Sequence, residues 1–293
     1  MSEHFQQRRS IILAALAAPL AGCASVPPAG GASDGSFLAA MRAIETAPGA
    51  RIGVAAFDTS GRRWLNHRGD ERFPMCSTFK IMPAAAMLAR GPELLSTRIR
   101  YSKDDLVSYS PITEKHLQDG MTNAELCAAT LQYSDNTAAN LLMKQLGGPE
   151  GMTAFARSRG DEVFRLDRWE TELNSAIPGD PRDTTSPLAM LNTLQKLTVG
   201  DGLPGPARST LVDWMLGNTT GNERMRAGVP AGWKVADKTG SGSYGTTNSI
   251  GVLYPPNRAP IIAVVFYTQA VKDAPNRNEV VAEATRAIVK ALA

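Results

Sequence analysis

The spacing of apolar residues along this chain differs between its ends and its middle. Residues 51–58 and 63–67 are rich in strand-forming residues and flank a short segment with a glycine, so they predict a hairpin of two strands. Similar runs return at 234–239, 247–253 and 261–268, near the other end of the chain. Strand patterns at both ends predict one sheet that is built from the two terminal parts of the sequence.

Helical periodicity dominates the remaining residues. Apolar residues recur at intervals of three and four over 35–46 and 278–291, which predicts an amphipathic helix in each of these segments. The long stretch between the two strand-rich parts is mostly helical in pattern and lacks a comparable strand run. The sequence therefore predicts an α/β domain made of 34–67 and 218–293, with an all-helical domain over 68–217 inserted into it.

A targeting segment precedes these elements. Arg8 and Arg9 are followed by an apolar run and then by small residues, which is typical of a signal peptide, here over 1–22. The double arginine also resembles a twin-arginine export signal. Because the cleavage region looks like a lipoprotein box, two interpretations stay open: Cys23 carries a lipid anchor, or it is a chance cysteine after an ordinary signal. Both place the protein in the periplasm, with 23–33 as a flexible tether.

Composition narrows the classes of function. The 293 residues carry a net charge of +3, and no basic run is interleaved with aromatic residues, which argues against nucleic acid as a partner. The three histidines have no ligand-like spacing, so we predict neither a metal nor another cofactor. Cys76 is predicted to be a buried free thiol, so we expect no disulfide between Cys76 and Cys127. We expect a monomer.

One short motif points to nucleophilic catalysis. Ser77 and Lys80 are three residues apart in a helical-looking segment, 77–90, so their side chains share one face. A serine hydroxyl is a weak nucleophile until a base removes its proton, and a buried lysine with a lowered pKa can do so. Free N–H groups at the helix start would stabilise an oxyanion. Pro83 also falls in this segment, and a proline in a helix interior costs about 3 kcal/mol.

Further motifs follow Ser77-Thr78-Phe79-Lys80 in a distinctive order. They are Tyr133-Ser134-Asp135-Asn136, the loop Trp169-Glu170-Thr171-Glu172-Leu173-Asn174, and Lys238-Thr239-Gly240. A Ser-x-x-Lys, Ser-Asp-Asn and Lys-Thr-Gly set is the signature of the class A serine β-lactamases. The chain resembles that family from Phe37 to its end, and its motifs are most similar to the cefotaximase-like branch.

The resemblance implies a fold, an activity and a set of site residues. The fold would be α/β, an antiparallel sheet flanked by helices, with an inserted all-helical domain that carries an omega-shaped loop. The activity would be hydrolysis of the β-lactam ring of penicillins and cephalosporins, and hence antibiotic resistance. The implied catalytic residues are Ser77, Lys80, Ser134, Glu170 and Lys238. The implied substrate-binding residues are Tyr109, Asn136, Asn174, Arg224, Thr239, Gly240 and Ser241.

In this family's chemistry Ser77 would attack the lactam carbonyl and form an acyl-enzyme. Ser134 would protonate the leaving nitrogen, and a water held by Glu170 and Asn174 would hydrolyse the ester. Whether Lys80 or Glu170 is the base for acylation stays open.

The resemblance also concerns charged groups outside the motifs. A pair that matches Arg168 and Asp183 ties the neck of the omega-shaped loop in the family, whereas the alternative is two solvated side chains worth under about 1 kcal/mol. Thr247 occupies a position where many relatives carry an arginine for the substrate carboxylate. We expect Arg224 to supply that charge instead, with Arg277 as the second candidate.

Two other functions remain to be weighed against hydrolysis. A penicillin-binding D-alanyl-D-alanine peptidase shares Ser-x-x-Lys and Lys-Thr-Gly but stalls after acylation. A non-catalytic lipoprotein that senses β-lactams would be acylated permanently. The glutamate loop with Glu170 and Asn174 argues against both, because it supplies the groups that deacylation needs.

Overall fold

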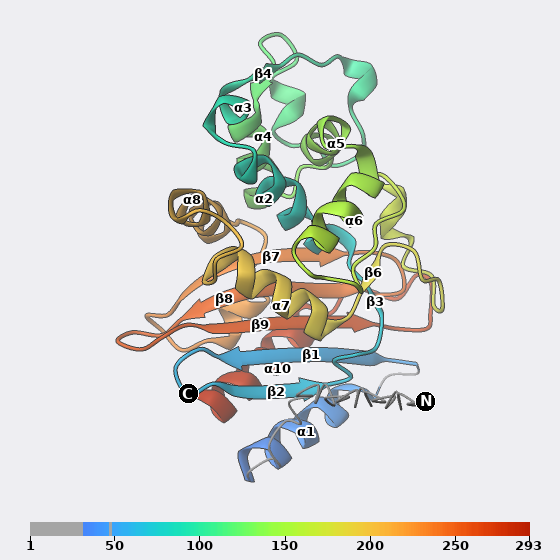
Figure 1. The fold of residues 1–293 in the computed structure, drawn as a ribbon. Coiled ribbons are helices and arrows are strands. Elements are labelled where there is room, and N and C mark those ends of the chain that lie inside the picture. The colour runs from blue at the N-terminus through green and yellow to red at the C-terminus, as the bar shows by residue number, and fades with distance from the viewer. Residues whose placement is uncertain (1–31, 47–48) are drawn as a thin grey trace, which may run out of the picture.

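The computed structural model describes residues 32–46 and 49–293, and Figure 1 shows their arrangement. The predicted signal peptide, the double arginine and Cys23 lie outside the described residues, as does nearly all of the predicted tether. Among the described helices, none is both long and apolar enough to cross a membrane.

A five-stranded sheet forms the centre of the molecule, with strand order β2-β1-β9-β8-β7. Every neighbouring pair is antiparallel, and the two outer segments of the chain meet where β1 pairs with β9. The antiparallel sheet predicted from the two chain ends is therefore confirmed. The strands are β1 Arg51–Asp58, β2 Arg63–His67, β7 Lys234–Ser241, β8 Thr247–Tyr254 and β9 Ile261–Thr268.

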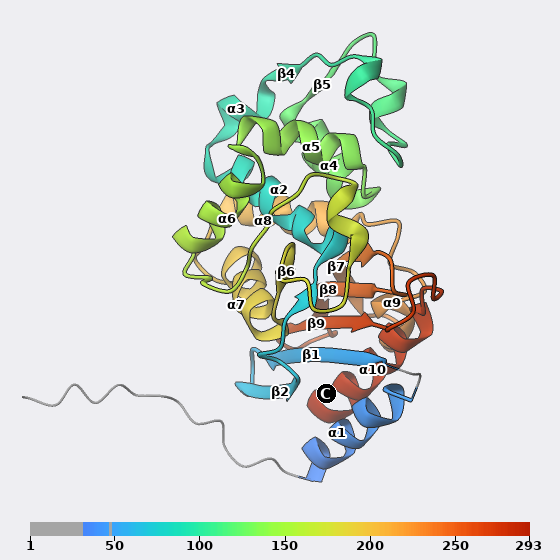
Figure 2. The same ribbon diagram turned by 90° about the vertical axis from the view of Figure 1, so that its right-hand side faces the viewer.

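Both faces of the sheet are covered, which explains why its central strands read as continuous apolar runs. Along β1, Val54 and Ala56 belong to one buried cluster, whereas Ala55 and Phe57 belong to the other. This alternation follows from the two-residue period of a strand. The helices α1 Ala32–Ile44 and α10 Asn278–Leu292 cover one face, and α7 Pro187–Thr198 covers the opposite face (Figure 2).

The segment between β2 and β7 is mainly helical. Most of it lies beyond the β7 edge of the sheet, whereas α7 packs on the sheet face (Figure 1). Its longer helices are α2 Ile81–Ala89, α4 Asn123–Gln132, α5 Asn136–Gln145, α6 Gly148–Ser158, α7 and α8 Gly205–Leu216. Its shorter helices are α3 Pro92–Ser96 and the 3-10 turns Cys76–Lys80, Lys103–Asp105, Thr113–Lys115 and Glu172–Ser175, and α9 Met225–Gly228 follows.

The segment also contains four strands of two residues each, which the sequence pattern did not indicate. They are β3 Phe73–Pro74, β4 Arg98–Ile99, β5 Met121–Thr122 and β6 Thr184–Thr185, paired β3 with β6 and β4 with β5. Two residues are too few for an alternating pattern to be recognised. The pairing of β3 with β6 joins the chain just before Ser77 to the end of the Glu170 loop.

The predicted helix over 77–90 is two different elements. Cys76–Lys80 is a 3-10 helix, η1, and the α-helix α2 begins only at Ile81. Pro83 is thus the third residue of α2, in the first turn, where proline is tolerated because the early N–H groups lack partners within an α-helix. The cost expected for a proline in a helix interior therefore does not apply in full.

Candidate active site

A pocket of about 340 Å³ lies where η1, the start of α5 and the end of β7 meet. Nine of the predicted site residues line it: Ser77, Tyr109, Ser134, Asn136, Asn174, Arg224, Thr239, Gly240 and Ser241. Thr220 is the tenth lining residue. Lys80, Glu170 and Lys238 are buried behind this lining. The segments that supply these groups are far apart in the sequence, and packing of η1 against β7 brings them together.

Lys80 occupies the centre of the site. Its Nζ lies 3.0 Å from the Ser77 Oγ and donates to the backbone oxygen of Ser134 at 2.7 Å. The same ammonium lies 3.0 Å from Oε1 of Glu170, and both side chains are fully excluded from solvent. Ser77 Oγ is also 3.3 Å from that carboxylate oxygen. The nucleophile therefore has an amine and a carboxylate within reach of its proton.

Burial sets the protonation chemistry of the two lysines. Burial lowers the pKa of Lys80, although the negative charge of Glu170 opposes this shift. The pKa of Lys238 lies well below its usual value, mainly because of burial and also because of repulsion from Lys80. Two ammonium groups in one dry site disfavour each other, so one of them loses its proton more readily than an exposed lysine would.

Ser134 lies between these lysines. Lys238 Nζ donates to its Oγ at 3.0 Å, and Lys80 Nζ approaches the same oxygen at 3.3 Å. Lys238 also donates to the backbone oxygen of Thr239 at 2.8 Å, which fixes the amine against β7. Ser134 has a positive φ of 59°, which is an uncommon backbone conformation for a residue other than glycine. This conformation, in the turn before α5, sets the direction of its side chain. A hydroxyl held this way can receive a proton on one side and donate it on the other.

Glu170 and Asn174 form the predicted pair in the polar loop. Asn174 Nδ2 lies 2.5 Å from Oε2 of Glu170, while its Oδ1 is buried with no hydrogen-bond partner among the described residues. An unpaired buried carbonyl oxygen is costly unless a water or ligand satisfies it. The two side chains can therefore hold a water between the loop and Ser77.

The neck of the same loop is closed by Arg168 and Asp183. Arg168 Nε lies 2.6 Å from Oδ2 of Asp183, whose side chain is 1% exposed. Oδ1 of Asp183 also accepts the backbone N–H groups of Asp167 and Arg168, at 2.8 and 3.0 Å. With these donors the carboxylate connects residues at the two ends of the loop.

Arg224 is the cation at the far end of the pocket. It is 7% exposed, donates to the backbone oxygens of Gly240 and Asn248 at 2.8 Å each, and reaches Ser241 Oγ at 2.6 Å. Burial lowers its pKa to about 10, which still leaves it charged at neutral pH. By contrast, Arg277 donates to Glu279 at 2.7 Å and is absent from the residues described as lining the pocket.

Gly240 permits the close approach of β7 to the nucleophile. A Cβ at this position would come within 2.8 Å of the Met75 backbone oxygen and 3.1 Å of the Thr78 backbone nitrogen. Real Cβ atoms essentially never show a contact of 2.8 Å, and a contact of 3.1 Å is tighter than most, so a side chain here would push β7 away from η1. The glycine of the Lys-Thr-Gly motif thus acts by its lack of a side chain.

Comparison with known proteins agrees with this geometry. The model of the "Beta-lactamase enzyme family" matches residues 37–292. The chain belongs to this family. Beta-lactamase OXY-1 of Klebsiella oxytoca is 51% identical over 97% of this chain and 98% of its own, and Beta-lactamase CTX-M-97 of Escherichia coli is 53% identical over 85% and 86%. The solved structure of an ancestral (GNCA) class A β-lactamase, 56% identical, superposes with a TM-score of 0.84 over 87% of this chain and 99% of its own.

Within the family, the chain is a class A serine β-lactamase of the CTX-M-like branch. The predicted fold, an α/β protein with an antiparallel sheet and helices around it, is likewise confirmed. Cys76 is a buried free thiol and forms no disulfide with Cys127, as predicted, and Cys127 is also buried.

Two residues that support the β-lactamase site were given no role by the sequence. Asn140 holds the backbone of Glu170 from both sides: its Nδ2 donates to the Glu170 oxygen at 2.9 Å, and its Oδ1 accepts the Glu170 N–H at 3.0 Å. It lies four residues after Asn136, on the same face of α5. Asp135 caps α5 through the Ala138 N–H and also accepts the Thr113 N–H. Helical spacing could have suggested Asn140, and a capping pattern Asp135.

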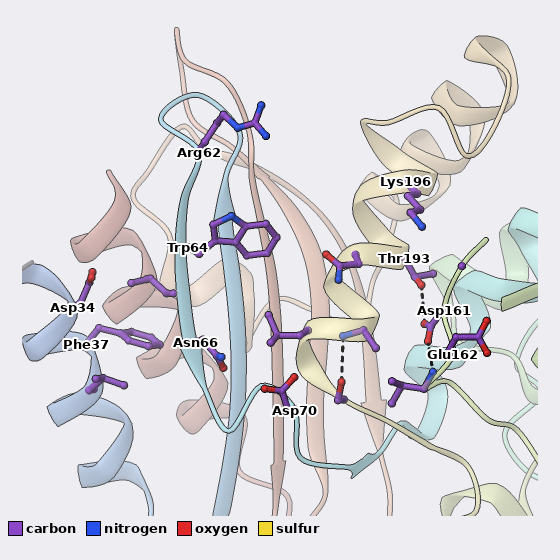
Figure 3. Close-up of a pocket in the computed structure, with 18 residues that line it drawn as sticks. Asp34, Phe37, Arg62, Trp64, Asn66, Asp70, Asp161, Glu162, Thr193 and Lys196 are labelled. Carbon is purple, nitrogen blue, oxygen red and sulfur yellow. Dashed lines mark hydrogen bonds between the residues drawn. The ribbon is translucent and has the colours of Figure 1, made fainter. Parts of the chain in front are cut away.

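A larger hollow of about 910 Å³ lies elsewhere, between β2 and α7 (Figure 3). Trp64 projects into it from β2, and Thr193 faces it from α7. Its buried acid, Asp161, is already satisfied by the Thr193 hydroxyl and by the N–H groups of Val163 and Phe164. None of the described residues that line this hollow also lines the pocket of Ser77, so size alone does not identify the active site.

Proposed function

We propose that this chain hydrolyses the β-lactam ring of penicillins and cephalosporins through an acyl-enzyme on Ser77. The observation that carries the proposal is the buried contact of Lys80 with both Ser77 and Glu170, at 3.0 Å each. Serine hydroxyl, amine and carboxylate are the groups that a covalent route with later hydrolysis needs.

In the first step, the Lys80–Glu170 pair takes the Ser77 proton as Oγ attacks the lactam carbonyl. The backbone N–H groups of Ser77 and Ser241 stabilise the oxyanion that forms. When the carbon–nitrogen bond of the ring breaks, Ser134 gives its proton to the nitrogen. Ser134 regains a proton from the neighbouring ammonium groups, so charge is balanced at each stage.

In the second step, a water next to Asn174 loses a proton to Glu170 and attacks the ester carbonyl. The ester bond to Ser77 breaks, Oγ regains a proton, and the opened product leaves. The Asn140 contacts to the Glu170 backbone support this step, because they hold the carboxylate at a defined place. A site that only acylates would not need Glu170 and Asn174 to hold and activate a water.

Substrate binding uses groups on both sides of Ser77. Thr239, Ser241 and Arg224 bind the carboxylate next to the ring nitrogen, where a charge-assisted hydrogen bond is about twice as strong as a neutral one. Asn136 binds the amide of the substrate side chain. Its Oδ1 is occupied by Lys80 and one N–H by the Ser108 oxygen, so its second N–H is the group that remains for substrate. Tyr109, which is 59% exposed, forms a wall of the pocket.

We further propose that the protein is exported to the periplasm and acts there as a monomer, with residues 34–67 and 218–293 as one domain and 68–217 as the other. The hydrophobic leader and its double arginine support export. Mass spectrometry of the mature N-terminus would distinguish a lipidated Cys23 from an ordinary cleaved signal.

Steady-state hydrolysis of a chromogenic cephalosporin by the purified mature chain tests the proposal. Turnover of many equivalents supports a β-lactamase. A single stoichiometric burst without further turnover would instead indicate a peptidase-like or sensor-like protein that stalls as the acyl-enzyme.

A further inference from the structure

Two threonine hydroxyls lie 2.5 Å apart at the carboxylate end of the pocket. One belongs to Thr239 on β7, and the other belongs to Thr220, in the loop between α8 and α9. Both residues line the pocket. Thr239 is part of the Lys-Thr-Gly motif, whereas no motif includes Thr220.

The direction of the hydrogen bond between them follows from Asn218. This side chain is 1% exposed, and its Nδ2 donates to Oδ2 of Asp237 at 2.8 Å. A carboxylate oxygen accepts, so the amide nitrogen must face Asp237 and the amide oxygen must face Thr220. That oxygen accepts the backbone N–H of Thr220 at 3.0 Å and the Thr220 hydroxyl at 2.8 Å.

A hydroxyl has a single proton, so Thr220 can only accept from Thr239 while it donates to Asn218. In the free protein the Thr239 proton therefore points at Thr220. An incoming carboxylate only accepts, and Thr239 must turn its proton towards it to bind. Without a compensating change, the Thr220 oxygen would lose its donor.

A concerted turn of both hydroxyls avoids that loss. Thr220 can turn its proton from Asn218 to Thr239 as Thr239 turns towards the carboxylate. Asn218 Oδ1 keeps the Thr220 backbone N–H, so no buried amide oxygen is left unpaired. Both arrangements contain two hydroxyl donations, and in the second one Thr239 accepts while it donates, which strengthens its bond to the ligand.

We propose that Thr220 is a positioning residue for the substrate carboxylate, acting through Thr239 by this reversal of two hydroxyl groups. The ligand class is a β-lactam with a free carboxylate next to the ring nitrogen. The inference rests on the proposed function and adds to it the residue that lets a motif hydroxyl change partners.

The test compares Thr220→Val, which keeps the shape without the hydroxyl, with Thr220→Ser, which keeps the hydroxyl. Thr219→Val is the matched control, because the exposed Thr219 hydroxyl donates to the Gln132 backbone oxygen, outside the pocket lining. We expect Thr220→Val to raise KM for a chromogenic cephalosporin about 2- to 4-fold, because Thr239 then donates to the carboxylate without accepting the hydrogen bond that strengthens this donation. The value of kcat should change less than about 2-fold, and Thr220→Ser and Thr219→Val should behave as wild type.

Two further measurements separate positioning from general damage to the fold. The methyl ester of the same cephalosporin should show a smaller KM difference between wild type and Thr220→Val, because its neutral carbonyl accepts a weaker hydrogen bond from Thr239 than a carboxylate does. In a Thr239→Val background, Thr220→Val should add nothing to KM, since it acts through the absent hydroxyl. If wild type is active, either of two results would overturn this inference: Thr220→Val keeps a normal KM for the acid, or its KM rises equally for the acid and the ester. An inactive wild type would instead overturn the proposed function.

Discussion

The Nζ of Lys80 lies 3.0 Å from Oε1 of Glu170, and both side chains have no exposed surface. Ser77 Oγ lies 3.0 Å from the amine and 3.3 Å from the carboxylate. Taking two charges out of water is costly, and only their mutual attraction and added hydrogen bonds offset that cost. The pair is therefore best regarded as one acid–base unit that shares the proton of the nucleophile.

The pH dependence of stability tests the burial of Lys238. Its pKa is lowered far below the ordinary 10.5 by burial, so between the two values the unfolded chain binds more protons than the folded one. Stability from this group therefore rises with pH across that window. We expect the free energy of unfolding of wild type, relative to Lys238→Met, to increase with pH below the ordinary lysine pKa of 10.5 in urea titrations. A difference that stays flat or falls would contradict the lowered pKa.

The clamp predicts a specific loss of stability and a change in selectivity. Asp183→Asn removes the charge that holds Arg168 and should cost about 3 kcal/mol, as for a broken buried pair. The looser loop should widen the pocket for bulky oxyimino cephalosporins and weaken penicillin hydrolysis. Asp180→Asn is the control, because Asp180 pairs with an arginine that is 48% exposed, and such pairs contribute less than about 1 kcal/mol. Unchanged ratios of kcat/KM between the two substrate classes in Asp183→Asn would rule out the clamp's effect on selectivity.

Arg224 is expected to supply the cation that Thr247 does not. Arg224→Ala should raise KM for penicillins by an amount equivalent to about 1.5–3 kcal/mol, the range for hydrogen bonds to charged groups. Arg277→Ala should change KM much less, since Arg277 is paired with Glu279. Because Arg224 also donates to two backbone oxygens, Tm is measured for both variants. If Arg277→Ala has the larger effect on KM, the assignment of the carboxylate cation is wrong.

Pro83 provides a test of the boundary between η1 and α2. As the third residue of α2 it should be nearly neutral, so Pro83→Ala should change the free energy of unfolding by less than about 1 kcal/mol. Ala85→Pro, two residues later in the same helix, should cost about 3 kcal/mol or more. A gain of several kcal/mol in Pro83→Ala would show that the proline strains the helix after all.

Sequence patterns predicted the helices and strands whose own residues carry a clear apolar spacing. The strands β1, β2 and β9 have the predicted bounds, because their apolar runs end at polar or turn residues. The strand β7 extends two residues beyond the prediction, because Gly240 and Ser241 are weak strand formers that pairing with β8 holds in the ladder. The strand β8 extends one residue beyond the prediction, to Tyr254. The nucleophile segment was predicted as one helix, because a 3-10 turn and an α-helix share nearly the same apolar spacing.

Contacts between distant segments were beyond the reach of such patterns. Asn140 touches Glu170 across 30 residues of sequence, and Thr220 touches Thr239 across 19. No local spacing encodes such pairs, which depend on how loops pack in the folded chain. The motif residues could be named because the family signature contains them. Asn140 and Thr220, which contact motif or loop residues, lie outside that signature.

The account depends most on Glu170 as the group that activates the deacylating water, and intact-mass spectrometry of Glu170→Ala tests this directly. After mixing with a penicillin, the variant should accumulate a long-lived adduct of one substrate mass, localised to Ser77 by peptide mapping. The double variant Ser77→Ala/Glu170→Ala should show no adduct. Near wild-type turnover by Glu170→Ala, with no adduct on Ser77, would contradict the account.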